Sequence, residues 1–214
     1  MVTFNQDYFR DDFTGSGSFS GRTPDSTSFG GQNWTGGGLV IDTGAAASAD
    51  QTNTGSSGTS VYGIPNSAWG NETDGHLLFD FTTGPSTGAN ANGHAGFSVS
   101  VNYDGYTMTA SLTGDTAGVW TLSVVPNTGM PAVTSVVTID PSTLYSVDIQ
   151  AGGANPSVDL NGGYATVSTS AGLSGSGYDG INLSWFSLTV GATCLVDGLY
   201  ANGSIFSGTV PTII

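Results

Sequence analysis

Apolar and polar residues alternate with a period of two in several blocks of the chain. The clearest blocks are residues 97–101, 106–112, 120–124 and 145–149. Successive side chains of a β-strand point to opposite faces of the sheet, so each block predicts a strand with one apolar and one hydroxyl-rich face. No segment repeats its apolar positions with the helical period. The pattern therefore predicts an all-β fold, a two-sheet antiparallel β-sandwich.

Further apolar blocks and turn sequences extend this prediction. Strand-length apolar blocks also occur at residues 39–41, 77–81, 133–139, 181–190 and 194–200. Asp104-Gly105 separates two alternating blocks, and Asn161-Gly162 follows the block at residues 158–160. These dipeptides are typical of tight hairpins, because both central residues of a type I′ turn need a positive φ. We expect a β-hairpin at each of the two places.

Two segments, residues 14–36 and 43–75, lack the alternation. Both are rich in Gly, Ser, Thr, Asn and Asp, and their aromatic residues stand alone, at Phe19, Phe29, Trp34, Tyr62 and Trp69. Long segments without strands or helices are uncommon in compact domains and are often functional. We expect both segments to form long loops or arms of a single domain that spans residues 1–214.

The charge of the chain narrows its possible partners. Two basic side chains, Arg10 and Arg22, oppose sixteen acidic ones, and the formal net charge is -14. Binding to nucleic acid or to an anionic membrane surface needs clustered Lys and Arg, so we expect neither partner. Charged residues make up 8% of the chain, against roughly 25% in an average domain. The surface is therefore expected to consist mainly of neutral polar groups.

Short motifs near both ends of the chain resemble a known family. They are residues 9–15 (FRDDFTG), residues 21–25 (GRTPD) with Trp34, residues 145–149 (YSVDI), residues 158–162 (VDLNG) and residues 195–200 (LVDGLY). Together they resemble the lectin-like, concanavalin A/laminin-G-type jelly rolls of bacteriophage virion proteins. The resemblance implies a concanavalin A-like jelly roll and a phage or similar viral origin. This fold hosts lectins, hydrolases and structural modules, so the resemblance leaves the function open.

The catalytic motifs in the sequence lack the context that they need. Residues 84–88 (GPSTG) fit the nucleophile pattern G-x-S-x-G, but the residues that follow are poor helix formers. Residues 175–180 (GSGYDG) fit the dinucleotide pattern G-x-G-x-x-G, yet they lead into an apolar block typical of a strand. Glycoside hydrolysis normally needs two opposed carboxyl groups, and nothing singles out such a pair. We therefore expect that the protein is not an enzyme.

Candidate ligand-binding residues are few. Asp11, Asp12, Asp25 and Asp197 could supply oxygen ligands to calcium, although no D-x-[DN]-x-[DN]-G loop is present. Aspartates that form turns or face solvent are the simpler interpretation, so we expect no cofactor and keep calcium as an alternative.

The polar segment around Tyr62 and Trp69 is a candidate glycan-binding site. It also contains Asn66, Asn71 and Glu72. Aromatic rings offer apolar faces on which sugar rings can stack, while amides and carboxylates bind sugar hydroxyls. The alternative interpretation is that the two rings pack this segment onto the sandwich.

The first hypothesis on function is a structural virion protein, most concretely a capsid decoration (cement) protein on the capsid surface. Its partners would be the major capsid protein or other virion subunits. A surface with few charges suits such repeated interfaces, because desolvating ions is costly. We expect a closed homo-oligomer, with a trimer favoured. The apolar C-terminal tail, residues 204–214, is expected to contact a subunit through Val210, Ile213 and Ile214.

The second hypothesis is a carbohydrate-binding module of a tail fibre that recognises a host glycan. Tyr62 and Trp69 would then contact the sugar rings. The family resemblance is compatible with this function. However, the chain shows no obvious coiled-coil or fibre-anchoring segment, which favours the first hypothesis.

Overall fold

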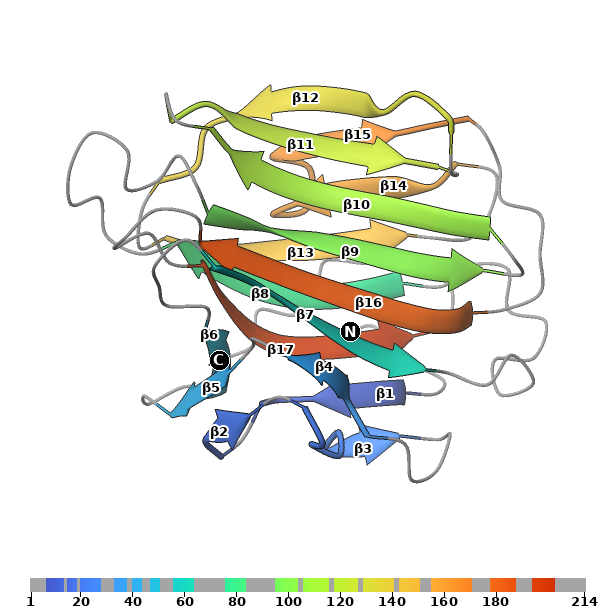
Figure 1. Ribbon diagram of the computed structural model, residues 1–214. Helices are drawn as coiled ribbons and strands as arrows, with labels where there is room; N and C mark the ends of the chain where they lie inside the picture. Colours follow the sequence, from blue (N-terminus) through green and yellow to red (C-terminus); the bar gives the residue numbers. More distant parts are fainter. Residues whose placement is uncertain are drawn as a thin grey trace.

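Every described element of the computed structural model is a β-strand, and the strands form two antiparallel sheets packed face to face (Figure 1). The structure describes residues 7–13, 15–18, 20–27, 33–37, 40–43, 47–50, 56–63, 76–83, 95–103, 106–115, 118–126, 129–140, 143–150, 155–170, 178–187 and 194–202. None of these segments forms a helix that could span a membrane. The predicted all-β, two-sheet antiparallel sandwich is confirmed.

The larger sheet, sheet A, has ten described strands. Across the sheet they follow the order β15 (Ala165–Ser168), β14 (Ser157–Leu160), β13 (Leu144–Gln150), β8 (His76–Thr83), β17 (Cys194–Asn202), β6 (Ala47–Asp50), β5 (Val40–Thr43) and β2 (Gly17–Ser18). Strand β1 (Asp7–Asp11) pairs with β17 and with β3 (Ser26–Thr27). Strands far apart in the sequence therefore lie side by side.

The other sheet, sheet B, has seven described strands. Their order is β12 (Val133–Val137), β11 (Trp120–Val125), β10 (Tyr106–Gly114), β9 (Ala95–Tyr103), β16 (Tyr178–Ser187), β7 (Ser56–Gly63) and β4 (Thr35–Gly37). In Figure 1, strands β9, β10, β11 and β16 face the viewer, with sheet A behind them.

The core lies between the two sheets and follows the alternation of the sequence. Side chains of β11 alternate between buried and half-buried, and those of β13 do the same from its second residue on. The Phe97 ring meets the Phe79 ring edge to face with centroids 4.9 Å apart, and Phe81 lies 5.4 Å from Phe97. Since β8 and β9 belong to different sheets, these rings join the two layers at the centre of the sandwich.

Both hairpins that the turn sequences predict are present. Tyr103 pairs with Tyr106, so β9 and β10 are joined through Asp104-Gly105, which lie outside the described residues. Leu160 pairs with Ala165, so the second hairpin has a four-residue loop instead of a two-residue turn. Asn161 and Gly162 have the expected positive φ values of 51° and 61°, and Gly163 has 107°. The third positive φ extends the loop beyond a type I′ turn.

Strands also occur inside the two segments expected to be loops, and this corrects the expectation for the residues concerned. Residues 14–36 contain β2, β3 and the start of β4, while residues 43–75 contain β6 and β7. Most of these strands have two to four residues, too few to reveal a period of two. The longest, β7 (SSGTSVYG), is mostly Gly, Ser and Thr, whose small contrast in hydropathy hides any alternation.

Gly163→Ala should destabilise the protein. A Cβ at this position would meet no atom within 4 Å, so the cost comes from the backbone, whose φ of 107° L-residues rarely adopt. We expect a loss of about 1–3 kcal/mol in the free energy of unfolding, measured by urea denaturation. Gly162→Asn, at a φ of 61° that asparagine tolerates, serves as the control and should change stability by about 0.5 kcal/mol or less. Equal stability of wild type and Gly163→Ala would contradict the strain argument.

Candidate functional site

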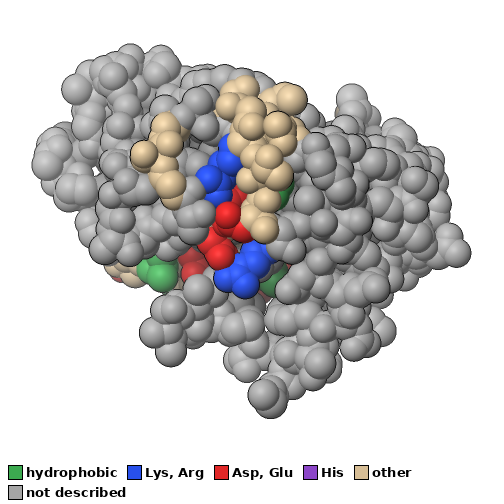
Figure 2. All heavy atoms as spheres, turned by 90° about the horizontal axis from the view of Figure 1, so that it is seen from below, with side chains coloured by type: hydrophobic (Ala, Val, Ile, Leu, Met, Phe, Trp, Pro, Cys, Tyr) green, Lys and Arg blue, Asp and Glu red, His purple; other side chains and the backbone are tan. Residues whose placement is uncertain are grey.

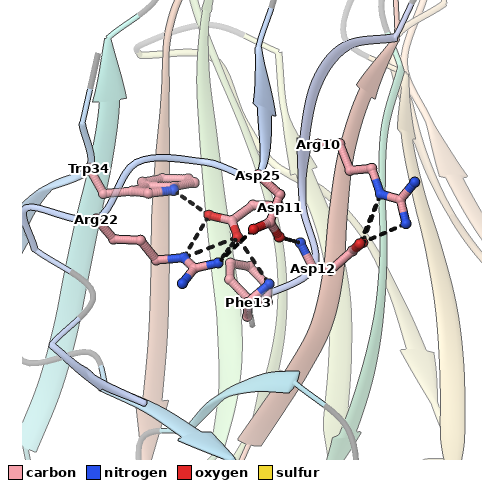
Figure 3. Close-up of polar contacts among 7 residues, drawn as sticks. All are labelled: Arg10, Asp11, Asp12, Phe13, Arg22, Asp25 and Trp34. Carbon is pink, nitrogen blue, oxygen red and sulfur yellow. Dashed lines mark hydrogen bonds and ion pairs between the residues drawn. The ribbon is translucent and has the colours of Figure 1, made fainter. Parts of the chain in front are cut away.

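Polar side chains gather where β1 meets the segments before β3 and β4; we call this group the Asp11 cluster (Figure 3). Its members are Arg10, Asp11, Asp12, Phe13, Arg22, Asp25 and Trp34. Two backbone hydrogen bonds hold these segments together: Gly21 N–H donates to Trp34 O at 2.7 Å, and Trp34 N–H donates to Arg22 O at 2.8 Å. Because β1 belongs to sheet A and β4 to sheet B, the cluster joins the two sheets.

The Asp11 carboxylate is the centre of the cluster and is fully buried. Its Oδ1 accepts hydrogen bonds from Arg22 Nη2 at 2.7 Å and from the Phe13 backbone N–H at 2.9 Å. Its Oδ2 accepts one from Trp34 Nε1 at 2.8 Å, and Arg22 Nε lies 3.1 and 3.2 Å from the two oxygens. A buried carboxylate is costly unless hydrogen-bonded donors surround it, and here they do.

The backbone of Phe13 is held in an uncommon conformation within this cluster. Its φ is 52°, which is rare for a bulky residue, and its ring is fully buried. The bond from Phe13 N–H to Asp11 Oδ1 closes a tight local turn around this strained residue. The chain direction after β1 is therefore fixed by the same carboxylate that holds Arg22 and Trp34.

The remaining contacts of the cluster are more exposed. The Asp12 backbone N–H donates to Asp25 Oδ2 at 2.8 Å, and Arg22 Nη2 lies 3.4 Å from Asp25 Oδ1. Arg10 Nη2 and Asp12 Oδ2 are 2.6 Å apart, with exposed fractions of 47% and 31%. Figure 2 shows the acidic and basic side chains in contact on the face seen from below. Both arginines of the sequence therefore pair with aspartates of this cluster.

Burial and neighbouring charged groups together shift the pKa values of Asp11 and Arg22. Burial raises the pKa of the Asp11 carboxyl, and the Arg22 guanidinium, the Trp34 indole N–H and the Phe13 N–H lower it in part. Burial also disfavours the charged form of Arg22, but the Asp11 carboxylate, with those of Asp25 and Asp12, outweighs this, and the pKa of Arg22 is raised. Arg22 thus carries its positive charge at any physiological pH.

The candidate calcium ligands are partly brought together. Asp11, Asp12 and Asp25 meet in the cluster, but their carboxylates accept hydrogen bonds from guanidinium, indole and backbone N–H groups. Asp197 lies in β17, where its backbone is opposite that of Asp80 on the neighbouring strand β8. Among the described residues, no group of three or more His, Cys, Asp or Glu side chains is arranged to hold a metal ion.

A second polar group lies on β8, on the sheet face opposite the core. Asp80 stands between the core residues Phe79 and Phe81, so its side chain points away from the core, yet it is only 8% exposed. Burial raises the pKa of the Asp80 carboxyl, and a hydrogen bond from Ser146 lowers it in part. His76 Nδ1 lies 2.9 Å from Asp148 Oδ1 on the neighbouring strand.

The residues predicted from the sequence to contact a glycan or another subunit remain predictions. Tyr62 lies in β7, where its backbone pairs with that of Ile181, and not in a loop. Trp69 lies outside the described residues, as do Val210, Ile213 and Ile214.

Sequence reasoning did not assign Trp34 and Arg22 to a common cluster around Asp11. The available signal was the pairing of the two arginines with aspartates, in FRDD and GRTPD, in a chain with no other basic residue. That pattern indicates ion pairs, but the fold alone shows that Asp11 is the buried one.

Comparison with known proteins identifies solved structures with a similar fold. No protein-family model and no curated protein matches the chain. The binding domain of botulinum neurotoxin serotype G has a TM-score of 0.59 and 10% identity, over 94% of this chain and 49% of that one. The CBM2 module of an evolved Dit protein of Lactobacillus casei BL23 phage J-1 has a TM-score of 0.57 and 17% identity, over 94% and 97% respectively. A carbohydrate esterase of Shiga toxin-encoding bacteriophage phi24B has a TM-score of 0.55 and 13% identity, over 89% and 100%.

At these identities the comparisons show the fold. The chain spans about half the length of the toxin domain but nearly the whole phage Dit module. The lectin-like β-sandwich that the sequence motifs imply is therefore confirmed as the fold.

Asp11→Ala should destabilise the protein far more than Asp12→Ala. Removing Asp11 leaves Arg22 and the Trp34 N–H without their buried acceptor, for an expected loss of about 3–5 kcal/mol. The neighbouring Asp12–Arg10 pair is exposed, so its loss should cost about 1 kcal/mol or less. Urea denaturation of the two variants measures both. Similar losses for the two variants would show that the Asp11 cluster does not depend on its buried carboxylate.

Asp80→Asn should stabilise the protein at neutral pH. Because the pKa of Asp80 is raised in the folded state, its contribution to stability is present below its unfolded pKa and is lost as the pH rises through the folded pKa. At pH 7 the variant should therefore melt at a higher temperature than wild type, and the difference should narrow below about pH 4. Thermal unfolding followed by circular dichroism over this pH range tests the expectation. A difference independent of pH would contradict it.

Proposed function

We propose that this protein is a carbohydrate-binding module of a bacteriophage virion that recognises a glycan receptor on the host surface. The observation that carries the proposal is the likeness to the CBM2 module of the phage J-1 Dit protein, which extends over 94% of this chain and 97% of that module. A match of whole module to whole module suits a shared mode of use better than a match to part of a larger protein.

Two further likenesses support the proposal, one through binding and one through carbohydrate. The botulinum neurotoxin structure is a binding domain, and the phage phi24B structure is a carbohydrate esterase. The names of both phage proteins thus refer to carbohydrate, and neither protein is named as a capsid decoration protein. The comparisons favour the tail-located, glycan-recognising hypothesis over capsid decoration, and a host glycan over the major capsid protein as partner.

The proposal assigns binding without turnover. The phi24B esterase shares the fold at 13% identity, a level at which catalytic residues are not carried over. The sequence motifs for catalysis lack their context, as described above. The module is therefore proposed to hold a glycan without cleaving or deacylating it.

Glycan-array binding tests the proposal. The full chain should bind a subset of glycans, and Trp69→Ala should weaken that binding by about tenfold, because a stacked ring is lost. Tyr164→Ala removes an aromatic side chain that is 54% exposed at the β14–β15 hairpin, and serves as the matched control that should bind like wild type.

Three outcomes would count against parts of the proposal. Absence of binding to every glycan would overturn the function. Binding that survives Trp69→Ala would remove that residue from the site. Release of acyl groups from an esterified glycan, followed by mass spectrometry, would overturn the assignment of binding without turnover.

A further inference from the structure

The two sheets differ sharply in charge. The described strands of sheet B contain a single charged residue, Asp179. The described strands of sheet A contain Asp7, Arg10, Asp11, Asp42, Asp50, Asp80, Asp148, Asp159 and Asp197. In a chain of net charge -14, the described strands of sheet B are therefore almost free of charged residues, while those of sheet A carry a large share of them.

The face of sheet B that points away from the core is lined with hydroxyl groups in register. Phe97 and Val99 are buried in the core, and Ser98 and Ser100 between and beyond them are half-buried, so the serines point outward. Ser98 pairs with Ser111, Ser111 with Ser123, and Ser123 with Thr134, which forms one row across β9, β10, β11 and β12. The register of this row continues to Ser184 of β16 and Thr59 of β7.

A neighbouring row lies two residues along the strands and continues from Thr109 to Val125 of β11. It contains Ser100 and Thr109, whose hydroxyl oxygens lie 2.9 Å apart. In the first row, the hydroxyl oxygens of Ser111 and Ser123 lie 2.7 Å apart. Strands are spaced about 4.8 Å apart, so the hydroxyls form a regular array. We call the face with these two rows the hydroxyl face.

Each bonded pair of hydroxyls still has hydrogen-bonding capacity. A serine or threonine hydroxyl has one donor and two acceptor sites, and the bond within a pair uses one donor and one acceptor. The Ser111–Ser123 pair thus retains one O–H and three acceptor sites for a ligand. Sugar hydroxyls are donors and acceptors of the same kind, and they carry no charge that an ion would have to match.

We propose that the hydroxyl face of sheet B is part of the glycan-binding surface and that the ligand is an uncharged glycan. This inference rests on the proposed function and adds the place and the chemical class of the ligand. The array of Ser and Thr offers hydrogen bonds to a neutral sugar chain laid across the strands. The face looks toward the viewer in Figure 1, and none of the sheet A strands crosses in front of it.

The charges of the chain disfavour an anionic glycan. Carboxylate, sulfate and phosphate groups of glycans are usually recognised by Arg or Lys. Here the two basic side chains already pair with aspartates, Arg22 with Asp11 at 2.7 Å and Arg10 with Asp12 at 2.6 Å (Figure 3). An anionic ligand would meet a net charge of -14 with no arginine or lysine beyond these pairs. Electrostatic repulsion would therefore weaken the binding of an anionic ligand.

A pair of matched double variants tests the hydroxyl face. Ser111→Ala with Ser123→Ala removes one bonded hydroxyl pair and should weaken glycan binding by about tenfold. Ser157→Ala with Ser168→Ala is the control, because these serines also lie directly opposite each other on adjacent strands, but in sheet A. The control should bind like wild type. Melting temperatures of both variants establish that each is folded before its binding is compared.

The glycan array carries neutral, sialylated and phosphate-bearing glycans, so the class of ligand is tested with the same protein. We expect the bound set to be neutral, and any weak signal from an anionic glycan to rise with added salt, because salt screens the repulsion. Wild-type binding that the sheet B variant retains in full would overturn the placement. Preferential binding of anionic glycans would overturn the ligand class and leave the proposed function standing. Absence of binding to any glycan would overturn the proposed function itself.

Discussion

The buried carboxylate of Asp11 holds the two layers of the sandwich together at the end where β1, β3 and β4 lie. It belongs to β1 of sheet A, and it accepts the indole N–H of Trp34, which directly precedes β4 of sheet B. Arg22 completes the contact from the segment between them. Replacing a buried ion pair by apolar residues is often neutral or stabilising, so the pair is not by itself evidence of a net gain in stability. Its donors fix which segments meet, in a region where strands of two or three residues contribute little pairing energy.

Elsewhere the fold is determined by packing, and there the sequence predicts the strands that contribute large apolar side chains to the core. The alternation in β11 and β13 is strong because each strand contributes large apolar side chains to the core at every second residue. The hairpin turns could also be predicted from the sequence, since Asn161 and Gly162 adopt the positive φ that their residue types favour. The length of the loop after β14 could not be predicted, because the additional positive φ at Gly163 depends on the register between β14 and β15. Short-range chemistry predicts that a turn occurs, and the partner strand decides where it ends.

The Asp11 cluster shows why the rest could not be predicted. Aspartates at 11, 12 and 25 have the same intrinsic chemistry, and as a sequence they suit calcium, solvent or arginine equally well. Only the fold gives Asp11 full burial and Asp12 an exposed partner. The outward row of Ser98, Ser111 and Ser123 was likewise visible as alternation within each strand, but its continuity across strands is a property of register. Function on a sheet face is therefore less accessible to sequence reasoning than function in a motif.

The distribution of charge connects these features. A protein with two basic side chains can neutralise few of its carboxylates, and here both arginines form ion pairs within the Asp11 cluster, which joins the sheets. The other carboxylates need solvent or a local donor, as Asp80 has in Ser146 and Asp148 in His76. Acidic residues are concentrated in the strands of sheet A, whereas sheet B presents hydroxyls that need no counter-ion. Desolvating a hydroxyl that is already bonded to its neighbour costs much less than desolvating an ion. Of the two described sheets, sheet B is consequently the one on which a neutral ligand would displace water mainly from hydroxyls and not from carboxylates.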